Sequence, residues 1–287
     1  MLVTWQLRDW LTYLSKHSQD MHRQATFVQV GANDGQTNDP LFASMQKNPG
    51  LWVGVLAEPV SFAIKRLRKL HADKSSWSIV QAAVTDRCNS SHITFWEFPQ
   101  TQTAAEFDAT PRTKRNLSIP RYIQIGQGNG LSQIQDWLKP KSVPCIDDVT
   151  DGLIQRHSSS PFKRALQANR LEQHGPAHLD LLQVDCETHD WRVIHALNFD
   201  LVRPRVVHFE GYGPAEIAIK KLVDAGYMIR KVDRMNYLAV DVSFVLLSIG
   251  AGPKSRLRSQ LRGAGLSRRR SIQCLRHRGG RWRWVND

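Results

Sequence analysis

The residues with the clearest chemical potential form a loop with the sequence QVGANDG, which begins at Gln29 and ends at Gly35. The loop follows the run Thr26–Val30, which is typical of a strand, and precedes residues that favour a helix. Glycines in such a connection permit a tight turn and let backbone N–H groups approach a ligand. We therefore predict a cofactor-binding turn that includes Gln29, Gly31, Ala32, Asn33 and Gly35.

A carboxylate one strand later indicates what kind of ligand the loop holds. Glu58 follows the run Trp52–Ala57, which is expected to be the neighbouring parallel strand. A carboxylate at that strand end can accept hydrogen bonds from both hydroxyls of a ribose. The dinucleotide fingerprint requires glycine at position 33, where this chain has Asn33. The loop thus favours an adenosyl ligand without phosphates, and an NAD-linked oxidoreductase is the weaker alternative.

Alternating strand and helix patterns supply the scaffold for these residues. After an amphipathic helix over residues 5–18, strand patterns alternate with helix patterns, which implies parallel strands joined by crossover helices. A polar insertion, residues 86–178, separates the third strand from the fourth and contains strand-like segments near 93–96 and 143–146. The sequence predicts a doubly wound, mostly parallel sheet. Its strands are expected at 26–30, 52–57, 78–84, 178–185, 205–210, 227–232 and 237–247, with a helix at 217–225.

Acidic side chains and histidines gather where the fourth and fifth strands are expected to end. Asp185 closes the fourth strand and Glu210 closes the fifth, two residues after His208. Both strand ends open on the same crevice in a doubly wound sheet, so Asp185 and Glu210 are candidate catalytic groups. His189 is a candidate general base because imidazole titrates near neutrality, although an exposed loop histidine is an equally good interpretation. A metal site at Asp185, Glu187 and His189 has no further support, and we predict no metal.

Five motifs follow one another along the chain: FVQVGANDG at 27–35, VLAEP at 55–59, VQAAV at 80–84, LLQVDCE at 181–187 and VVHFE at 206–210. In this order they resemble the FkbM family of S-adenosylmethionine-dependent methyltransferases. The first motif is extended by Asn38-Asp39-Pro40, as in one branch of the family, and Val143–Asp148 resembles the segment that precedes the fourth strand. The resemblance covers residues 26–248.

The resemblance implies a class I methyltransferase fold with a seven-stranded sheet, and S-adenosyl-L-methionine as cofactor. It implies O-methylation of a hydroxyl on a small molecule, a sugar or a glycan. Gly31 and Gly35 would line the methionine part of the cofactor, Glu58 the ribose, and Asp185 would lie under the sulfonium. Ala82 and Ala83 would lie near the adenine.

One departure from the family pattern lies directly after the fourth strand. The usual phrase is Asp-x-Glu-Gly, and this chain has Asp185-Cys186-Glu187-Thr188. If that glycine has a positive φ, threonine costs about 1 kcal/mol or more there. A homologue that binds the cofactor without turnover is therefore an alternative.

Positive charge is concentrated at the C-terminus. Residues 253–287 hold ten arginines and one lysine against one acidic residue, Asp287, so they carry +10 of the net +13. We expect three parts: an N-terminal helix (1–25), a methyltransferase domain (26–250) and a basic tail without fixed structure (251–287). The tail suggests an alternative function in nucleic-acid binding or RNA-directed methylation, and it resembles a nuclear-import signal.

The remaining features suggest a cytoplasmic protein, with the nucleus as the alternative. No stretch approaches the roughly 18 apolar residues of a membrane span, and the N-terminus lacks the apolar region of a secretory signal. The four cysteines form no CxxC pair, so we expect reduced, mostly buried thiols. Glycosylation sequons at Asn89 and Asn116 are read as chance matches. The cysteines are Cys88, Cys145, Cys186 and Cys274.

Overall fold

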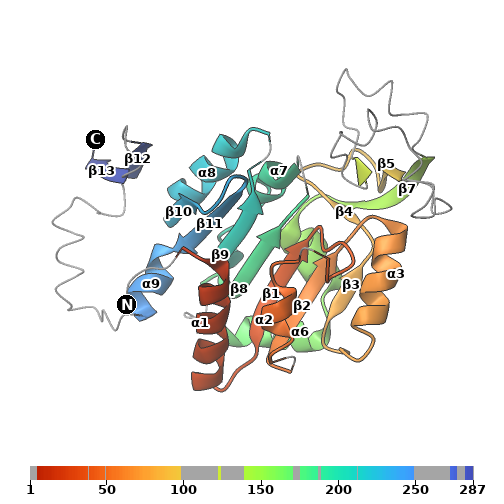
Figure 1. Cartoon of the computed structure of the whole chain (residues 1–287), viewed down its shortest axis with the longest axis horizontal. Helices are drawn as coiled ribbons and strands as arrows, with labels where there is room; N and C mark the ends of the chain where they lie inside the picture. The colour runs from red at the N-terminus through yellow and green to blue at the C-terminus, as the bar shows by residue number, and fades with distance from the viewer. Residues whose placement is uncertain are drawn as a thin grey trace.

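A seven-stranded sheet forms the centre of the molecule (Figure 1). The computed structural model describes residues 5–37, 39–48, 50–97, 122–123, 139–170, 175–186, 189–211, 213–248, 272–276 and 282–286. Neighbouring strands are parallel except where β11 pairs with β10 and β9. This arrangement confirms the predicted mostly parallel sheet. From one edge the strands are β10 (Tyr227–Lys231), β11 (Asn236–Asp241), β9 (Val202–Glu210), β8 (Ala177–Val184), β1 (Ala25–Val30), β2 (Trp52–Ala57) and β3 (Ser78–Val80).

The order in which strands are added to the sheet changes side between β1 and β8. After β1, the strands β2 and β3 are added towards one edge, and β8 and the strands of the sheet that follow it lie on the other side of β1. At such a switch point the two flanking loops leave in opposite directions, which opens a crevice beyond the carboxyl ends of the strands. The sheet topology therefore places the end of β1 and the end of β8 around one crevice.

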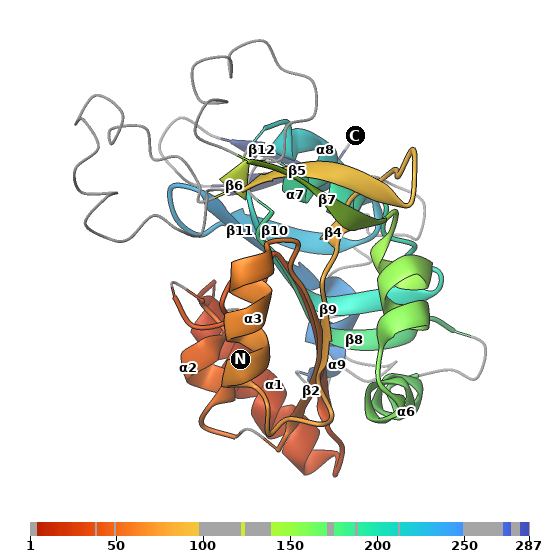
Figure 2. The same cartoon turned by 90° about the vertical axis from the view of Figure 1, so that its right-hand side faces the viewer.

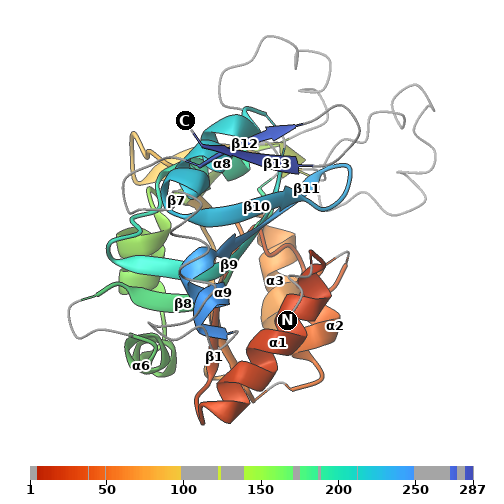
Figure 3. The same cartoon turned by 90° about the vertical axis from the view of Figure 1, so that its left-hand side faces the viewer.

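Helices cover both faces of the sheet, as Figures 2 and 3 show. Residues of β1 alternate between the two faces: Phe27 packs with Trp10 and Leu67 on one side, and Val28 packs with Phe162 and Leu222 on the other. The first face carries α1 (Leu7–Asp20), α2 (Phe42–Met45), α3 (Ser61–Leu70) and α9 (Val242–Ser248). The second carries the π-helical η2 (Val149–Gln155), α6 (Ser160–Ala168), α7 (Asp190–His195) and α8 (Ala215–Asp224).

Helix α1 shares the hydrophobic core of the sheet. Trp10, Leu11 and Leu14 are buried, and the ring of Trp10 lies 6.3 Å from that of Phe244 in α9. The sequence pattern treated residues 1–25 as a separate segment. The contacts with α9 show that α1 packs against an element more than 200 residues away, so it belongs to the same folded unit.

A second, four-stranded sheet occupies the insertion between the third and fourth strands of the central sheet. Its order is β4 (Ala83–Val84), β7 (Lys139–Ile146), β5 (His92–Glu97) and β6 (Tyr122–Ile123). The strands expected near 93–96 and 143–146 are confirmed as β5 and β7. The single strand expected at 78–84 is wrong: β3 and β4 belong to different sheets, because the chain leaves β2 after Val80 and joins β7 at Ala83.

The expectation of reduced thiols is wrong for two of the cysteines. Cys88 and Cys145 form a disulfide. The backbone N–H of Cys145 on β7 donates to the carbonyl of Ser91 at 2.9 Å, which brings β7 beside the turn that holds Cys88. Strand pairing thus joins cysteines that are 57 residues apart in sequence, a proximity that no local pattern reveals. Cys186 is a free, half-buried thiol, in line with the expectation.

Three further segments differ from the sequence pattern or extend it. The strand expected at 237–247 stops at Asp241, whose carboxylate accepts hydrogen bonds from the backbone N–H (2.9 Å) and hydroxyl (2.8 Å) of Ser243 and so starts α9. Helix α6 lies within the stretch expected to be irregular, and Ser159 caps it. Within the basic tail, β12 (Ile272–Arg276) pairs with β13 (Trp282–Asn286); its other residues lie outside the described part of the chain.

Across the described ranges, no helix is both long enough and apolar enough to cross a bilayer.

Candidate functional site

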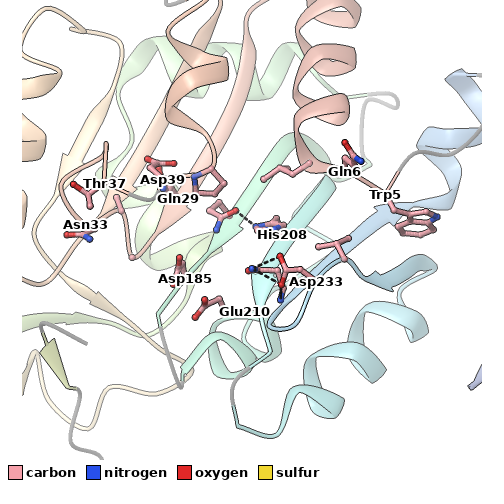
Figure 4. Close-up of a pocket in the computed structure, with 17 residues that line it drawn as sticks. Trp5, Gln6, Gln29, Asn33, Thr37, Asp39, Asp185, His208, Glu210 and Asp233 are labelled. Atoms are coloured by element: carbon pink, nitrogen blue, oxygen red, sulfur yellow. Dashed lines mark hydrogen bonds between the residues drawn. The ribbon is translucent and has the colours of Figure 1, made fainter. Parts of the chain in front are cut away.

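A cavity of about 560 Å³ lies at the switch point of the central sheet. The ends of β1, β8 and β9 form its floor, the N-terminal end of α1 borders it on one side, and the β10–β11 hairpin borders it on another (Figure 4). This is the place that the topology predicts for a ligand. The side chains used below come from each of these elements: Trp5, Gln29, Asp39, Gln183, Asp185, His208, Glu210 and Asp233.

The glycine loop packs directly against the end of β8. Gly31 has φ +80°, and a Cβ added to it would lie 1.9 Å from the backbone oxygen of Asp185. The N–H of Gly31 donates to the carbonyl of Ala57 at 2.9 Å, and the N–H of Asp185 donates to the carbonyl of Val30 at the same distance. Glycine is therefore required at position 31 both by its backbone conformation and by the closeness of β8.

Glu58 holds the other side of this loop. Its carboxylate accepts hydrogen bonds from the backbone N–H of Asn33 at 2.7 Å and of Val60 at 2.8 Å, and the residue is fully buried. Asn33 has φ 48°, a left-handed conformation that asparagine tolerates better than most residues. In this structure the Glu58 side chain thus stabilises the turn by binding the backbone of the turn, and Glu58 does not line the cavity.

Three other residues predicted to contact the cofactor also lie away from the cavity lining. Gly35 is buried against α3, where an added Cβ would lie 2.4 Å from Leu67 Cδ1. Ala82 and Ala83 are buried as well, at 2% and 4% exposure. Of the residues predicted to bind the cofactor or to act in catalysis, the following line the cavity together: Gln29, Gly31, Ala32, Asn33, Asp185 and Glu210.

A row of polar side chains crosses the floor of the cavity. Gln29 on β1 pairs in register with Gln183 on β8, which pairs in turn with His208 on β9. His208 Nδ1 lies 2.6 Å from Gln183 Oε1 (Figure 4). Neither Gln183 nor His208 was among the predicted site residues. The signal was present, because each of the three strands carries one polar residue at the position next to its last apolar residue.

Carboxylates lie at the ends of the same strands. Burial raises the pKa of Asp185 to about 6; the negative charge of Asp39 adds to the rise, while a hydrogen bond with the Glu210 side chain opposes it. Burial also raises the pKa of Asp190 well above its usual range, and the charges of Asp185 and Glu210 add to that rise. The Asp190 carboxylate accepts a hydrogen bond from the backbone N–H of Glu210 at 3.2 Å. This cluster therefore retains protons up to unusually high pH.

Asp39 joins this cluster in a way that the sequence pattern did not indicate. From the sequence it was identified only as part of the extension of the first motif, whereas in the structure its carboxylate accepts a hydrogen bond from the backbone N–H of Leu41 at 2.7 Å. Its second oxygen accepts from Gln29 Nε2 at 3.3 Å, at the edge of the cavity. Burial raises its pKa.

His189, the predicted general base, is not among the lining residues. It precedes α7 and is half-buried, and its pKa is lowered by burial and by the nearby charge of Arg192. Glu187 and Thr188, the altered part of the family phrase, lie outside the described residues. In the described ranges no three His, Cys, Asp or Glu side chains form a group that could hold a metal ion.

Comparisons with known proteins found similarity in structure only. No family model matches the chain, and no curated protein matches it in sequence. Similar solved structures include the METTL16 methyltransferase domain (10% identity, 82% of this chain and 65% of that one, TM-score 0.35). Another is precorrin-6y C5,15-methyltransferase from Geobacter metallireducens (10% identity, 82% of this chain and 87% of that one, TM-score 0.34). A third is ribosomal protein L11 methylase from Lactobacillus delbrueckii subsp. bulgaricus (10% identity, 82% of this chain and 78% of that one, TM-score 0.34). The chain thus spans less than two thirds of the METTL16 domain. The fold assignment given above is based on the strand order of this chain itself.

Proposed function

We propose that this protein is an S-adenosylmethionine-dependent methyltransferase of the FkbM type that methylates a hydroxyl on a small molecule, a sugar or a glycan. The observation that carries the proposal is the position of the cavity. It lies at the switch point of the sheet, with the glycine loop on one side and the carboxyl groups of Asp185 and Glu210 on the other.

The chemistry of the cavity lining fits this cofactor. When bound, S-adenosylmethionine supplies an electrophilic methyl group on a positively charged sulfonium. Asp39, Asp185 and Glu210 line the cavity and offer negative charge to the sulfonium and to the ammonium group of the methionine part. Among the described residues of the lining there is neither a lysine nor an arginine. We assign the methionine part to Gly31, Ala32 and Asn33.

Asp185 is suited to remove the proton of the acceptor hydroxyl. With a pKa raised to about 6, its carboxyl is mostly ionised at neutral pH and is more basic than an ordinary aspartate. When bound, the cofactor would supply the methyl group that the acceptor oxygen takes up and would leave as neutral S-adenosylhomocysteine, so the task of this chain's own residues is to receive the hydroxyl proton. The hydroxyl proton passes to Asp185, and Glu210 holds the Asp185 carboxyl in place through their hydrogen bond.

The contacts with the adenosine part are assigned by the family resemblance alone. Glu58 would bind the ribose and Ala82 and Ala83 the adenine, and these remain predictions. Because the Glu58 carboxylate is turned towards the N–H groups of Asn33 and Val60, a ribose contact requires the loop to shift. Loss of Glu58 would weaken cofactor binding through the loop whether or not it touches the ribose.

Calorimetric titration with S-adenosylhomocysteine tests the cofactor assignment. We expect the wild-type protein to bind it, and Glu58→Ala to weaken binding at least about tenfold because the glycine loop loses its anchor. Glu216→Ala is the matched control, since Glu216 is an exposed carboxylate in α8. Absence of binding by folded wild-type protein, or unchanged binding by Glu58→Ala, would contradict the proposal.

A homologue that binds the cofactor without turnover is the second candidate, and Thr188 motivates it. The two candidates differ in transfer of a labelled methyl group to metabolite extracts. Robust transfer by wild-type protein excludes the inactive homologue, and transfer that appears only in Thr188→Gly supports it.

A further inference from the structure

His208 presents an unprotonated ring nitrogen to the cavity. Its Nδ1 lies 2.6 Å from the amide oxygen of Gln183, which can only accept a hydrogen bond, so Nδ1 carries the proton and Nε2 carries the lone pair. Both residues are deeply buried, at 6% and 1% exposure. No described residue hydrogen-bonds to Nε2, and His208 lines the cavity, so this lone pair is left for a ligand.

Burial keeps this histidine neutral. The pKa of His208 is lowered to about 4 by burial, although the charge of Asp233 acts in the opposite direction. The pKa of Asp233 is itself lowered, since the hydrogen bonds from the backbone N–H groups of Met235 and Asn236 outweigh its partial burial. At neutral pH the ring therefore accepts a hydrogen bond and adds no positive charge.

The charge of the cavity lining argues against an acceptor that carries a phosphate or a carboxylate. Asp39, Asp185, Glu210 and Asp233 line it, and none of the lining residues that the structure describes is a lysine or an arginine. The methionine part of the cofactor carries its own ammonium and sulfonium cations beside its carboxylate. A phosphate or carboxylate on the acceptor brings no such cation and would meet these carboxylates uncompensated by the described lining, at a high electrostatic cost in a partly buried site. Trp5, at the edge of the lining beyond Gln6, adds an aromatic side chain (Figure 4).

We infer that the acceptor is an uncharged polyhydroxylated molecule, such as a sugar unit without phosphate or carboxylate, and that His208 Nε2 accepts a hydrogen bond from one of its hydroxyls. The inference rests on the proposed function and narrows its acceptor. His208 is a binding residue at the acceptor, and Gln183 is a positioning residue that fixes the ring tautomer. Neutral sugars donate hydrogen bonds to carboxylates and imidazole and pack their C–H faces on an aromatic ring, which matches this lining.

Nitrogen NMR of the histidine rings tests the tautomer and the acceptor together. The wild-type protein is saturated with S-adenosylhomocysteine and titrated with methyl glucoside, methyl mannoside and myo-inositol, and then with glucose 6-phosphate and mannose 6-phosphate. We expect the His208 signal to show a protonated Nδ1 and a free Nε2. We expect at least one neutral polyol to shift Nε2, and the phosphorylated sugars to bind at least about tenfold more weakly than their neutral parents.

Variants separate binding from folding. Gln183→Met preserves the side-chain volume and removes the acceptor for Nδ1–H. It should raise the KM for the polyol with little change in kcat, while His208→Asn should raise KM about tenfold or more. His178→Gln is the matched control, because His178 is equally buried on β8 and has a similarly lowered pKa of about 4, but does not line the cavity.

Three results would overturn the inference: protonation of His208 on Nε2, a phosphorylated sugar that binds more tightly than its parent, or a saturated complex in which no neutral polyol shifts Nε2. Failure of the proposed function gives a different result, since S-adenosylhomocysteine then does not bind at all.

Discussion

Asp185 must meet two opposing requirements. Burial favours its neutral form, which is why the pKa rises from 3.8 to about 6, whereas proton removal from a hydroxyl needs the charged form. Because the pKa in the folded state is above the unfolded value, the protonated carboxyl stabilises the fold at low pH. That contribution is present below pH 3.8 and is lost as pH rises through about 6. Function at neutral pH thus has a cost in stability at this residue.

Asp185→Asn should therefore have opposite effects on activity and on stability. Methyl transfer should fall about 100-fold or more because the proton acceptor is lost. At pH 8 the free energy of unfolding should rise by about 1 to 3 kcal/mol, because a neutral amide replaces a buried charge. Urea unfolding at pH 4 and pH 8 measures the second effect. A wild-type rate that stays flat between pH 5 and pH 7, with no rise near 6, would argue against Asp185 as the base.

Gly31 is the residue at which an added methyl group should do most harm. In Gly31→Ala the Cβ would lie 1.9 Å from the Asp185 backbone oxygen, so the loop and β8 must separate. We expect a loss of about 2 kcal/mol or more in unfolding free energy, together with loss of S-adenosylhomocysteine binding. Gly50→Ala is the control, since nothing lies within 4 Å of its added Cβ. Normal stability and binding in Gly31→Ala, measured by urea unfolding and calorimetry, would show that the loop is not packed as described.

At the scale of elements, the sequence predicted best where both faces of a strand are buried. The strand at 52–57 is a continuous apolar run and the strand at 26–30 is mostly apolar, and the structure shows them as β2 and β1 with every residue buried. The run 78–84 looked similar, yet it is divided between two sheets because its pairing partners lie in distant segments. The run after Asp241 is equally apolar and becomes a helix because a buried carboxylate caps it. Local patterns cannot report either influence.

The same limit applies to the site. Asp185 and Glu210 were predicted because each follows a clear strand. Gln183 and His208 were not: each is a polar residue next to the last apolar residue of its strand, but only the strand register shows that these positions lie side by side across β8 and β9. His189 was favoured for its chemistry alone, and the start of α7 places it outside the cavity lining.

The disulfide between Cys88 and Cys145 should stabilise the small sheet. It closes a loop of 57 residues, for which chain entropy gives an upper value of about 4 kcal/mol. We expect the Cys88→Ser, Cys145→Ser double variant to lose about 2 to 4 kcal/mol in unfolding free energy. Cys186→Ser is the control, because it replaces a cysteine that forms no disulfide.

Alkylation without reductant, followed by mass spectrometry, should leave Cys88 and Cys145 unlabelled in the native protein and label Cys186 after unfolding. Labelling of all three would contradict the bond.

For the whole molecule, the basic tail and the cavity carry charge of opposite sign. The tail, residues 253–287, carries +10, and the remaining 252 residues carry +3. In the described part of the chain, the cavity is lined by carboxylates and by no lysine or arginine. A polyanion such as RNA is therefore attracted to the tail and repelled from the site of methyl transfer. If RNA binds this protein, we expect it to be a partner of the tail and not the acceptor.

Deletion of residues 253–287 tests this separation. The full chain should bind single-stranded RNA with an affinity that falls steeply with salt, because arginine–phosphate contacts release counterions. The deletion should abolish that binding and leave S-adenosylhomocysteine affinity unchanged. A full-length control replaces Arg268, Arg269 and Arg270 by glutamine. It should weaken RNA binding and make the slope of log K against log salt about 2 units shallower, since each of three lost phosphate contacts accounts for about 0.7. Salt-sensitive RNA binding that survives the deletion would place the RNA on the methyltransferase domain and would reopen RNA as the acceptor.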